Sequence, residues 1–242
     1  MTDLDNSFGT QDVAPDERQR RVRDLFNRVA PRYDLMNDAM SFGIHRWWKR
    51  RFVRGLPKTG LWVDLAGGTG DVAVLAAREP ERTVVVCDPS LEMMNAGRPA
   101  RQASQILWVA GEGEQLPFAD ASVAALTVAF GLRNVTHLEV ALAEARRVLQ
   151  PGGVFVCLEF SRPYWWFRPF YDAYSYLVIP RLGALIAQQP DAYQYLVDSI
   201  RRFPAQRPFA QMLRDAGLVD VDYRNLSFGI ACIHRGCAET AS

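Results

Sequence analysis

A glycine-rich segment with the sequence DLAGGTG, from Asp64 to Gly70, is the clearest binding motif in the chain. Glycine lets the backbone approach a ligand closely, and the N-terminus of a following helix offers unpaired N–H groups to an anionic group. Asp88 ends the next apolar run, where a carboxylate can accept hydrogen bonds from both hydroxyls of a ribose. Gly68, Gly70 and Asp88 therefore predict a site for a nucleotide-like cofactor.

The glycines do not by themselves identify this cofactor. The stretch from Gly68 to Ala73 also satisfies the G-x-G-x-x-G/A pattern of NAD-binding proteins, so an NAD-linked oxidoreductase stays open. Asp64 lies just before the glycines, where a carboxylate can attract a cationic ligand. A third segment, from Gly111 to Phe118, offers acidic and backbone groups to the edge of an adenine. These two features favour S-adenosylmethionine over NAD.

The elements that must position these groups alternate along the chain. Short apolar runs are separated by helix-compatible stretches, and this alternation is typical of a parallel sheet with helices on both faces. The sequence therefore predicts an α/β, Rossmann-like domain. The predicted strands are 61–66, 83–88, 106–110, 123–130, 154–160, 218–223 and 229–235, and the predicted helices of this core are 72–78, 91–98, 138–149 and 209–216.

A length of 242 residues is suited to one α/β domain with a full hydrophobic core. We expect residues 1–15 to form a flexible arm and residues 16–242 to form this domain. Apolar spacing predicts an N-terminal amphipathic helix from Asp16, and a second helix is expected over Ile44–Val53. Residues 162–203 break the alternation with an aromatic-rich stretch, which we interpret as an inserted helical cap over the site.

Charge and composition exclude several classes of function. A formal net charge of +1 gives no field that would gather a polyanion, so nucleic acid is not an expected partner. No apolar stretch reaches the roughly 20 residues that a bilayer requires, and the first residues lack the apolar region of a secretory signal, so we expect a cytoplasmic protein. Cys232, His234 and Cys237 show no evident fourth ligand, and no metal site is predicted.

Several separated segments closely resemble the ubiquinone/menaquinone biosynthesis C-methyltransferase family. Because these segments are spread along nearly the whole chain, they identify a family more specifically than a single glycine loop does. The resembling segments are YDLMNDAMSFGIHRWW at 33–48, FGLRNV at 130–135, RVLQPGG at 147–153 with LEFS at 158–161, and YDAYS at 171–175.

The resemblance implies a class I S-adenosylmethionine-dependent methyltransferase with a seven-stranded sheet. The implied substrate is a polyprenylated quinol whose ring carbon is methylated in ubiquinone biosynthesis, menaquinone biosynthesis or both. The candidates are 2-methoxy-6-polyprenyl-1,4-benzoquinol and demethylmenaquinol. The resemblance also carries cofactor contacts onto Thr69, Asp88, Glu112 and Gly113, with Ala129 as a further contact. The family often has Asn-Ala at the positions of Glu112 and Gly113, and Ser at the position of Ala129.

Methylation of a ring carbon requires that the carbon be made nucleophilic by an adjacent ionised hydroxyl. A free phenol has a pKa of about 10 and is mostly neutral at pH 7, so a base or a cation must help. Arg133 follows the fourth predicted strand, at the edge where ligands of open α/β sheets collect. Its guanidinium would stabilise the developing phenolate and could order a water that takes the proton, so Arg133 is the predicted catalytic residue. Alternatives are His45, Asp34, Asp172 and Tyr174.

A polyprenyl quinol resides in the bilayer, so we expect peripheral contact with the inner face of the membrane. The sequence leaves open a homo-oligomer or a quinone biosynthesis complex, in which the chain could also be a non-catalytic cofactor-binding member. The side chains expected at the membrane are Trp47, Trp48, Lys49, Arg50, Arg51, Trp165 and Trp166.

Overall fold

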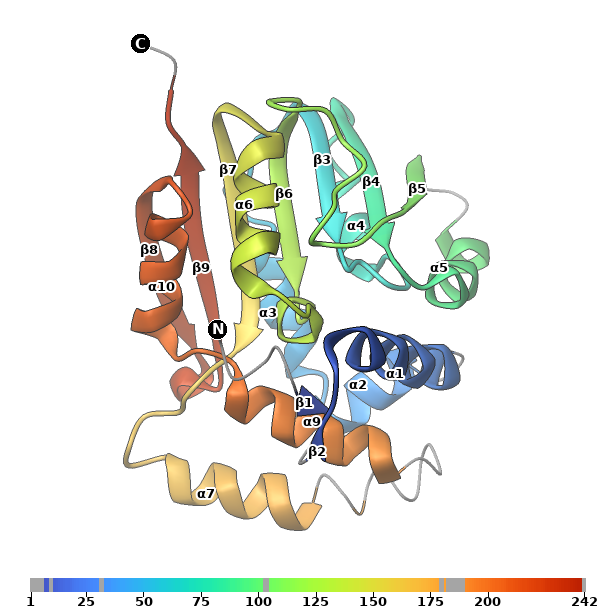
Figure 1. Cartoon of the computed structure of the whole chain (residues 1–242), viewed down its shortest axis with the longest axis vertical. Coiled ribbons are helices and arrows are strands. Elements are labelled where there is room, and N and C mark those ends of the chain that lie inside the picture. Colours follow the sequence, from blue (N-terminus) through green and yellow to red (C-terminus); the bar gives the residue numbers. More distant parts are fainter. Residues whose placement is uncertain are drawn as a thin grey trace.

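A mixed seven-stranded sheet forms the centre of the computed structural model, which describes residues 7–8, 11–30, 33–101, 105–178, 181 and 190–240 (Figure 1). The strand order is β5-β4-β3-β6-β7-β9-β8. The ladders that join β5, β4, β3, β6 and β7 are parallel, whereas β9 runs antiparallel to both β7 and β8. The predicted Rossmann-like fold is confirmed, and the last strand pair adds an antiparallel edge to it. The strands are β3 Gly60–Leu65, β4 Arg82–Asp88, β5 Ile106–Ala110, β6 Val123–Ala129, β7 Leu149–Phe160, β8 Leu218–Leu226 and β9 Ala231–Ala238.

Alternate side chains of the strands enter two apolar layers, one on each face of the sheet. Val63 and Leu65 of β3 belong to the layer that α6 and α10 cover, while Trp62 belongs to the opposite layer with α3 and α4. Buried β-branched residues suit strands that are covered on both faces. The helices of the core are α3 Ile44–Phe52, α4 Asp71–Ala76, α5 Leu91–Gly97, α6 Leu138–Val148 and α10 Gln206–Asp215.

The described helices α1, α2, α7 and α9 lie beyond the carboxyl ends of the parallel strands, and Figure 1 shows them beneath the arrowheads of β3 and β6. An apolar cluster that includes Val22, Leu25 and Val29 of α1 and Tyr195 and Val197 of α9 joins the N-terminal region to the inserted region. The helical insert is thus present and lies at the edge where the site was predicted. These helices are α1 Pro15–Val29, α2 Tyr33–Ser41, α7 Arg168–Ala173 with its π-helical continuation Tyr174–Val178, and α9 Pro190–Arg202.

Two features of the N-terminal region differ from the sequence prediction. α2 was not predicted, because its sequence YDLMNDAMS has no extended apolar stripe. Within the arm, β1 Ser7–Phe8 and β2 Gln11–Asp12 pair as a two-stranded antiparallel sheet, and the flexibility of residues 1–15 stays a prediction. Across the described ranges no helix combines the length and apolar character required to span a bilayer.

Candidate active site

A cavity of about 120 Å³ opens at the carboxyl edge of β3, β4 and β6. It is lined by the glycine loop, by the end of β4, by the segment after β5 and by the end of β6. Of the predicted cofactor residues, the structure brings together Gly68, Asp88, Glu112, Gly113 and Ala129 in its wall. The geometry therefore places four segments that are distant in sequence around one candidate binding site.

Asp88 joins the end of β4 to the glycine loop. Its Oδ2 accepts a hydrogen bond from the Gly68 amide at 2.8 Å, and its Oδ1 accepts one from the Ser90 amide at 2.8 Å. Burial raises the pKa of Asp88 to about 6, although these two amides oppose the shift, so the carboxylate is mostly ionised at neutral pH. Each oxygen retains a lone pair, and the pair of oxygens can accept both hydroxyls of a ribose.

Asp64 places an unsatisfied carboxylate oxygen at the same cavity. Thr127 donates a hydrogen bond to Oδ1 at 3.0 Å, but the buried Oδ2 has no hydrogen-bond partner among the described residues. Burial raises the pKa of this carboxyl to about 8. A buried carboxyl without a full set of partners costs stability when ionised, and a cation bound beside it would relieve that cost. The cavity thus fits a cofactor that combines a ribose with positive charge.

We expect Asp64→Asn to stabilise the protein without cofactor at pH 8. In the unfolded chain this carboxyl titrates near 3.8, so between about pH 4 and pH 8 only the folded protein holds the proton. The free energy of unfolding therefore falls as pH rises through this window, by about 2–5 kcal/mol from this group. Thermal melts at pH 5 and pH 8 should show a smaller decrease in Tm for Asp64→Asn than for the wild type, and equal decreases would contradict the assignment.

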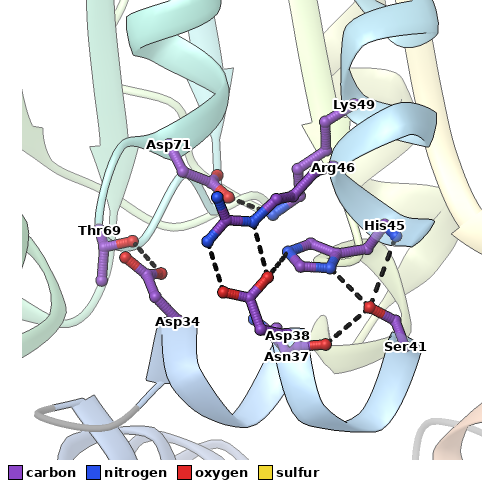
Figure 2. A network of polar contacts seen from close by, with 9 residues as sticks. All are labelled: Asp34, Asn37, Asp38, Ser41, His45, Arg46, Lys49, Thr69 and Asp71. Carbon is purple, nitrogen blue, oxygen red and sulfur yellow. Dashed lines mark hydrogen bonds and ion pairs between the residues drawn. The ribbon is translucent and has the colours of Figure 1, made fainter. Parts of the chain in front are cut away.

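Thr69 and Gly70 shape the loop but do not line this cavity. The Thr69 hydroxyl donates a hydrogen bond to Asp34 Oδ1 of α2 at 3.0 Å, as Figure 2 shows. Gly70 has φ of +78°, and a Cβ atom there would lie 2.7 Å from the Trp108 ring, so only glycine suits this turn. Their contact with cofactor stays a prediction.

The N-terminal helix α1 forms a wall of the cavity that sequence reasoning missed. Glu112 accepts a hydrogen bond from Gln19 at 2.5 Å and forms an ion pair with Arg23 at 2.6 Å. Glu112 therefore has two partners in α1. The amphipathic pattern of α1 predicts an apolar face, but no local signal tells which surface that face covers.

A second cavity, of about 380 Å³, lies between α1, the α2–α3 region and the inserted helices. Its wall is mostly apolar and aromatic, and Figure 1 shows these helices gathered at one end of the sheet. Such a wall suits a largely apolar ligand that is oriented by a few polar groups. The aromatic members of the described wall are Phe26, Phe42, Trp48, Phe130, Phe160, Phe167, Phe170, Tyr171, Tyr174 and Tyr195.

The two cavities share Phe26, Lys49 and Phe130 in their walls. Phe130 has φ of +59°, a strained conformation for a non-glycine residue that is found most often at functional sites. The buried Lys49 ammonium forms an ion pair with Asp71 at 2.5 Å and lies 6.0 Å from the centre of the Phe130 ring. A ligand in one cavity can therefore face a ligand in the other across these side chains.

Arg133 lines the second cavity and is 4% exposed. Its Nη1 forms an ion pair with Glu159 Oε1 at 2.9 Å and also donates to the Phe130 carbonyl, while its buried Nε has no hydrogen-bond partner among the residues that the structure describes. Burial raises the pKa of Glu159, and the adjacent guanidinium opposes that shift. Arg133 thus lies in the wall of the second cavity, and its catalytic role stays a prediction.

The structure corrects two residues of the predicted membrane surface. Trp48 is 3% exposed and donates its indole N–H to Ser227 Oγ at 2.9 Å, and Lys49 is 6% exposed in its ion pair with Asp71. Both lie on the inner face of α3, because an amphipathic helix of alternating aromatic and basic residues must bury one face. Trp47, Arg50, Trp165 and Trp166 are exposed, and Arg51 is half-buried.

Cysteines and histidine of the last strand form no metal centre in the described part of the chain, where no three potential ligands converge. Cys232 Sγ lies 3.9 Å from His234 Nε2, and that ring nitrogen is also 3.0 Å from the Gln206 carbonyl. Cys87 and Cys157 are buried free thiols within the sheet, and burial raises the pKa of Cys87 to about 12. The buried side chains of Cys87, Cys157, Cys232 and His234 thus contribute to the packing of the core.

Comparison with known proteins decides between the functional classes that the cofactor motif leaves open. Residues 14–238 match the model of the ubiE/COQ5 methyltransferase family. The chain belongs to that family. A relative from Rubrivivax gelatinosus, named ubiquinone/menaquinone biosynthesis C-methyltransferase UbiE, is 59% identical over 243 residues that cover 100% of this chain and 96% of the relative.

A plant relative is also similar to this chain, and a solved structure shares its fold. The mitochondrial 2-methoxy-6-polyprenyl-1,4-benzoquinol methylase of Arabidopsis thaliana is 46% identical, with 94% of this chain and 88% of that protein covered. The fold is similar to that of a SAM-dependent methyltransferase from Thermotoga maritima, described as a possible histamine N-methyltransferase. That match has a TM-score of 0.65 and 18% identity, and it covers 90% of this chain and 100% of the other. The predicted methyltransferase class and family are confirmed.

Proposed function

We propose that this protein transfers a methyl group from S-adenosylmethionine to a ring carbon of a polyprenylated quinol in ubiquinone or menaquinone biosynthesis. The observation that carries the proposal is that the first cavity, which is lined by Asp64 and Asp88, meets the aromatic second cavity at Phe26, Lys49 and Phe130. The family assignment and the names of the relatives support C-methylation in quinone biosynthesis.

The groups of the first cavity support the choice of cofactor. Asp88 presents its carboxylate to the ribose, and the unsatisfied oxygen of Asp64 lies where it can stabilise positive charge. Glu112, Gly113 and Ala129 are proposed to flank the adenine and methionine portions, with Ala129 contributing backbone groups. S-adenosylmethionine supplies a methyl group that its sulfonium has already activated.

The residues of the second cavity orient the acceptor ring and promote its ionisation. The aromatic wall excludes water and packs against the quinol ring, which places a ring carbon in line with the methyl group. We propose that the guanidinium of Arg133, which lines this cavity, binds the oxygen adjacent to that carbon, since a fixed cation favours the phenolate over the neutral hydroxyl. Glu159 fixes the guanidinium in this orientation.

The test of the proposed function is the quinone content of a strain that lacks the gene, measured by mass spectrometry. We expect the unmethylated benzoquinol, demethylmenaquinol or both to accumulate, and reintroduction of the wild-type gene to restore the methylated quinones. The identity of the accumulated species names the substrate. An unchanged quinone profile would contradict the proposal.

Exposed aromatic side chains surround the second cavity and support the proposed contact with a membrane. Phe42 and Phe170 line that cavity although they are 74% and 71% exposed, so they lie at its opening. Trp165 is 85% exposed, and Trp166 packs edge-on against Phe228 with ring centres 5.2 Å apart. An exposed aromatic patch around an apolar cavity is typical of proteins that take a ligand from a bilayer.

We expect Trp165→Ala/Trp166→Ala to lower the fraction of protein that floats with vesicles containing anionic phospholipid by about threefold or more. Each exposed indole contributes apolar area and an interfacial anchor, and both are lost in the variant. Leu107→Ala is the control, because Leu107 is 56% exposed on the edge strand β5. Equal flotation of the wild type and the tryptophan variant would show that this patch does not bind the membrane.

A further inference from the structure

His45 forms part of the wall of the aromatic cavity, although its exposed fraction is 7%. It belongs to the polar network of Figure 2, which joins α2, α3, the glycine loop and α4. The network brings Asp38, Ser41 and His45 together next to the ion pair of Lys49 and Asp71. These polar side chains lie in or beside the wall of a mostly apolar cavity, so they are candidates for a role in the chemistry of a bound ligand.

The hydrogen bonds of Ser41 fix the position of the proton on the His45 ring. Ser41 Oγ lies 2.7 Å from the Asn37 carbonyl oxygen, which can only accept, so the single hydroxyl proton is used in that bond. His45 Nδ1 lies 2.6 Å from the same hydroxyl oxygen and must therefore be the donor. The neutral ring thus carries its proton on Nδ1 and has its lone pair on Nε2.

The Asp38 carboxylate lies beside Nε2, where it would stabilise a proton taken up by that nitrogen. Asp38 Oδ1 lies 3.8 Å from Nε2, and Arg46 donates to both oxygens of this carboxylate, which lowers the pKa of Asp38. Neutral Nε2 and the Asp38 carboxylate are both hydrogen-bond acceptors, so they form no hydrogen bond with each other. Once Nε2 carries a proton, the positive ring is attracted to the carboxylate. Burial and the positive charge of Lys49 lower the pKa of His45, while Asp71 and Asp38 oppose the shift, so the ring is neutral at pH 7.

The other titratable groups in the described wall of this cavity do not offer a lone pair to a hydroxyl proton. Lys49 and Arg133 are cations in ion pairs. Burial raises the pKa of Tyr171 to about 12, and it also raises the pKa values of Tyr174 and Tyr195, whose hydroxyls donate to the Met40 carbonyl and to Asn134. These phenols stay protonated at neutral pH, so they are donors.

We propose that His45 is a catalytic residue whose Nε2 accepts the proton of the quinol hydroxyl adjacent to the methylated carbon, with Ser41 fixing the tautomer and Asp38 stabilising the imidazolium. This inference rests on the proposed function and assigns the proton acceptor within it. Arg133 then stabilises the oxygen that has lost the proton. The two roles are distinct, because a guanidinium has no lone pair to accept a proton.

The atoms balance through the reaction. The O–H bond of the quinol breaks and its proton moves to Nε2, and the ring carbon forms a bond to the methyl carbon while the S–C electron pair returns to sulfur. The ring carbon then loses its hydrogen to water as a proton, and the oxygen recovers a proton from the imidazolium. The net products are the methylated quinol, S-adenosylhomocysteine and one proton.

His45→Gln is expected to lower kcat at pH 7 by about 10²-fold, which is the lower range for loss of a general base. The Kd for S-adenosylhomocysteine should stay within about threefold of the wild-type value. As pH rises toward 10 the quinol ionises without help, so the defect should shrink at least tenfold, whereas the defect of a variant damaged only in structure would not. His137→Gln on the surface is the matched control and should keep the wild-type kcat and pH profile.

Asp38→Asn provides a second measurement that does not remove the imidazole. We expect the kinetic pKa of the basic group to fall, and kcat at pH 8, where the ring is neutral in both proteins, to decrease about tenfold, because the imidazolium that forms during the reaction loses its counter-charge. A nitrophenol that absorbs when ionised gives a readout without turnover, and its bound ionised fraction at fixed pH should fall in His45→Gln. Folded His45→Gln protein that keeps kcat within threefold, or an unchanged ionised fraction, would overturn the inference. Wild-type protein that methylates no quinol would instead contradict the proposed function.

Discussion

Arg133→Met is expected to lower kcat for quinol methylation by about 10³-fold while the Kd for S-adenosylhomocysteine changes by less than threefold. The substitution removes the charge at the wall of the aromatic cavity, where it is proposed to stabilise the developing phenolate, but it replaces no residue that lines the first cavity. Steady-state kinetics with methyl-labelled cofactor and calorimetry with S-adenosylhomocysteine measure the two quantities.

A structural role of Arg133 must be separated from a catalytic one, because the single variant leaves Glu159 buried without its cation. Removal of one member of a buried pair costs about 3–5 kcal/mol, whereas replacement of both members by apolar residues is often nearly neutral. The double variant Arg133→Met/Glu159→Leu should therefore recover the wild-type Tm to within a few degrees and stay inactive. Recovery of activity along with stability would assign Arg133 a purely structural role.

Asp88→Ala is expected to raise the Kd for S-adenosylhomocysteine by about 10³-fold. Two charge-assisted hydrogen bonds to the ribose hydroxyls are lost, each of which contributes about 1.5–3 kcal/mol, and the Gly68 and Ser90 amides lose their acceptor. Calorimetric titration measures the change. The control is Asp120→Ala, whose side chain is 78% exposed in an ion pair with Arg147 and should leave the Kd unchanged. A Kd for Asp88→Ala within tenfold of wild type would contradict the ribose assignment.

The core of the fold could be predicted from the sequence because its signals are local. A buried parallel strand such as TVVVCD is an apolar run of β-branched residues, and the observed β4 begins within one residue of the predicted start at 83. Gly217 ends α10 with φ of +85°, as a glycine after an apolar helix predicts. The antiparallel direction of β9 could not be predicted from local sequence, because the direction in which strands pair depends on contacts between residues that are far apart in the chain.

The candidate site was only partly predictable, for the same reason. Asp64 and Asp88 lie at the carboxyl ends of β3 and β4, and Gly68 belongs to the loop that follows β3. The carboxyl ends of parallel strands meet at one edge of a sheet, so the convergence of these residues follows from topology. The contact of Glu112 with Gln19 joins segments far apart in the chain and has no sequence pattern. The burial of Lys49 within a basic stretch could not be predicted from the sequence either, because the packing of α3 against its neighbours decides which of its cations face inward.

The most direct test of the account is the product formed when purified protein is given a vesicle-borne polyprenyl quinol and S-adenosylmethionine with a deuterated methyl group. The account predicts a quinol that carries the deuterated methyl on a ring carbon, formed by the wild type and lost in Arg133→Met. Label on a quinol oxygen, or label absent from the quinol although S-adenosylhomocysteine binds, would contradict it.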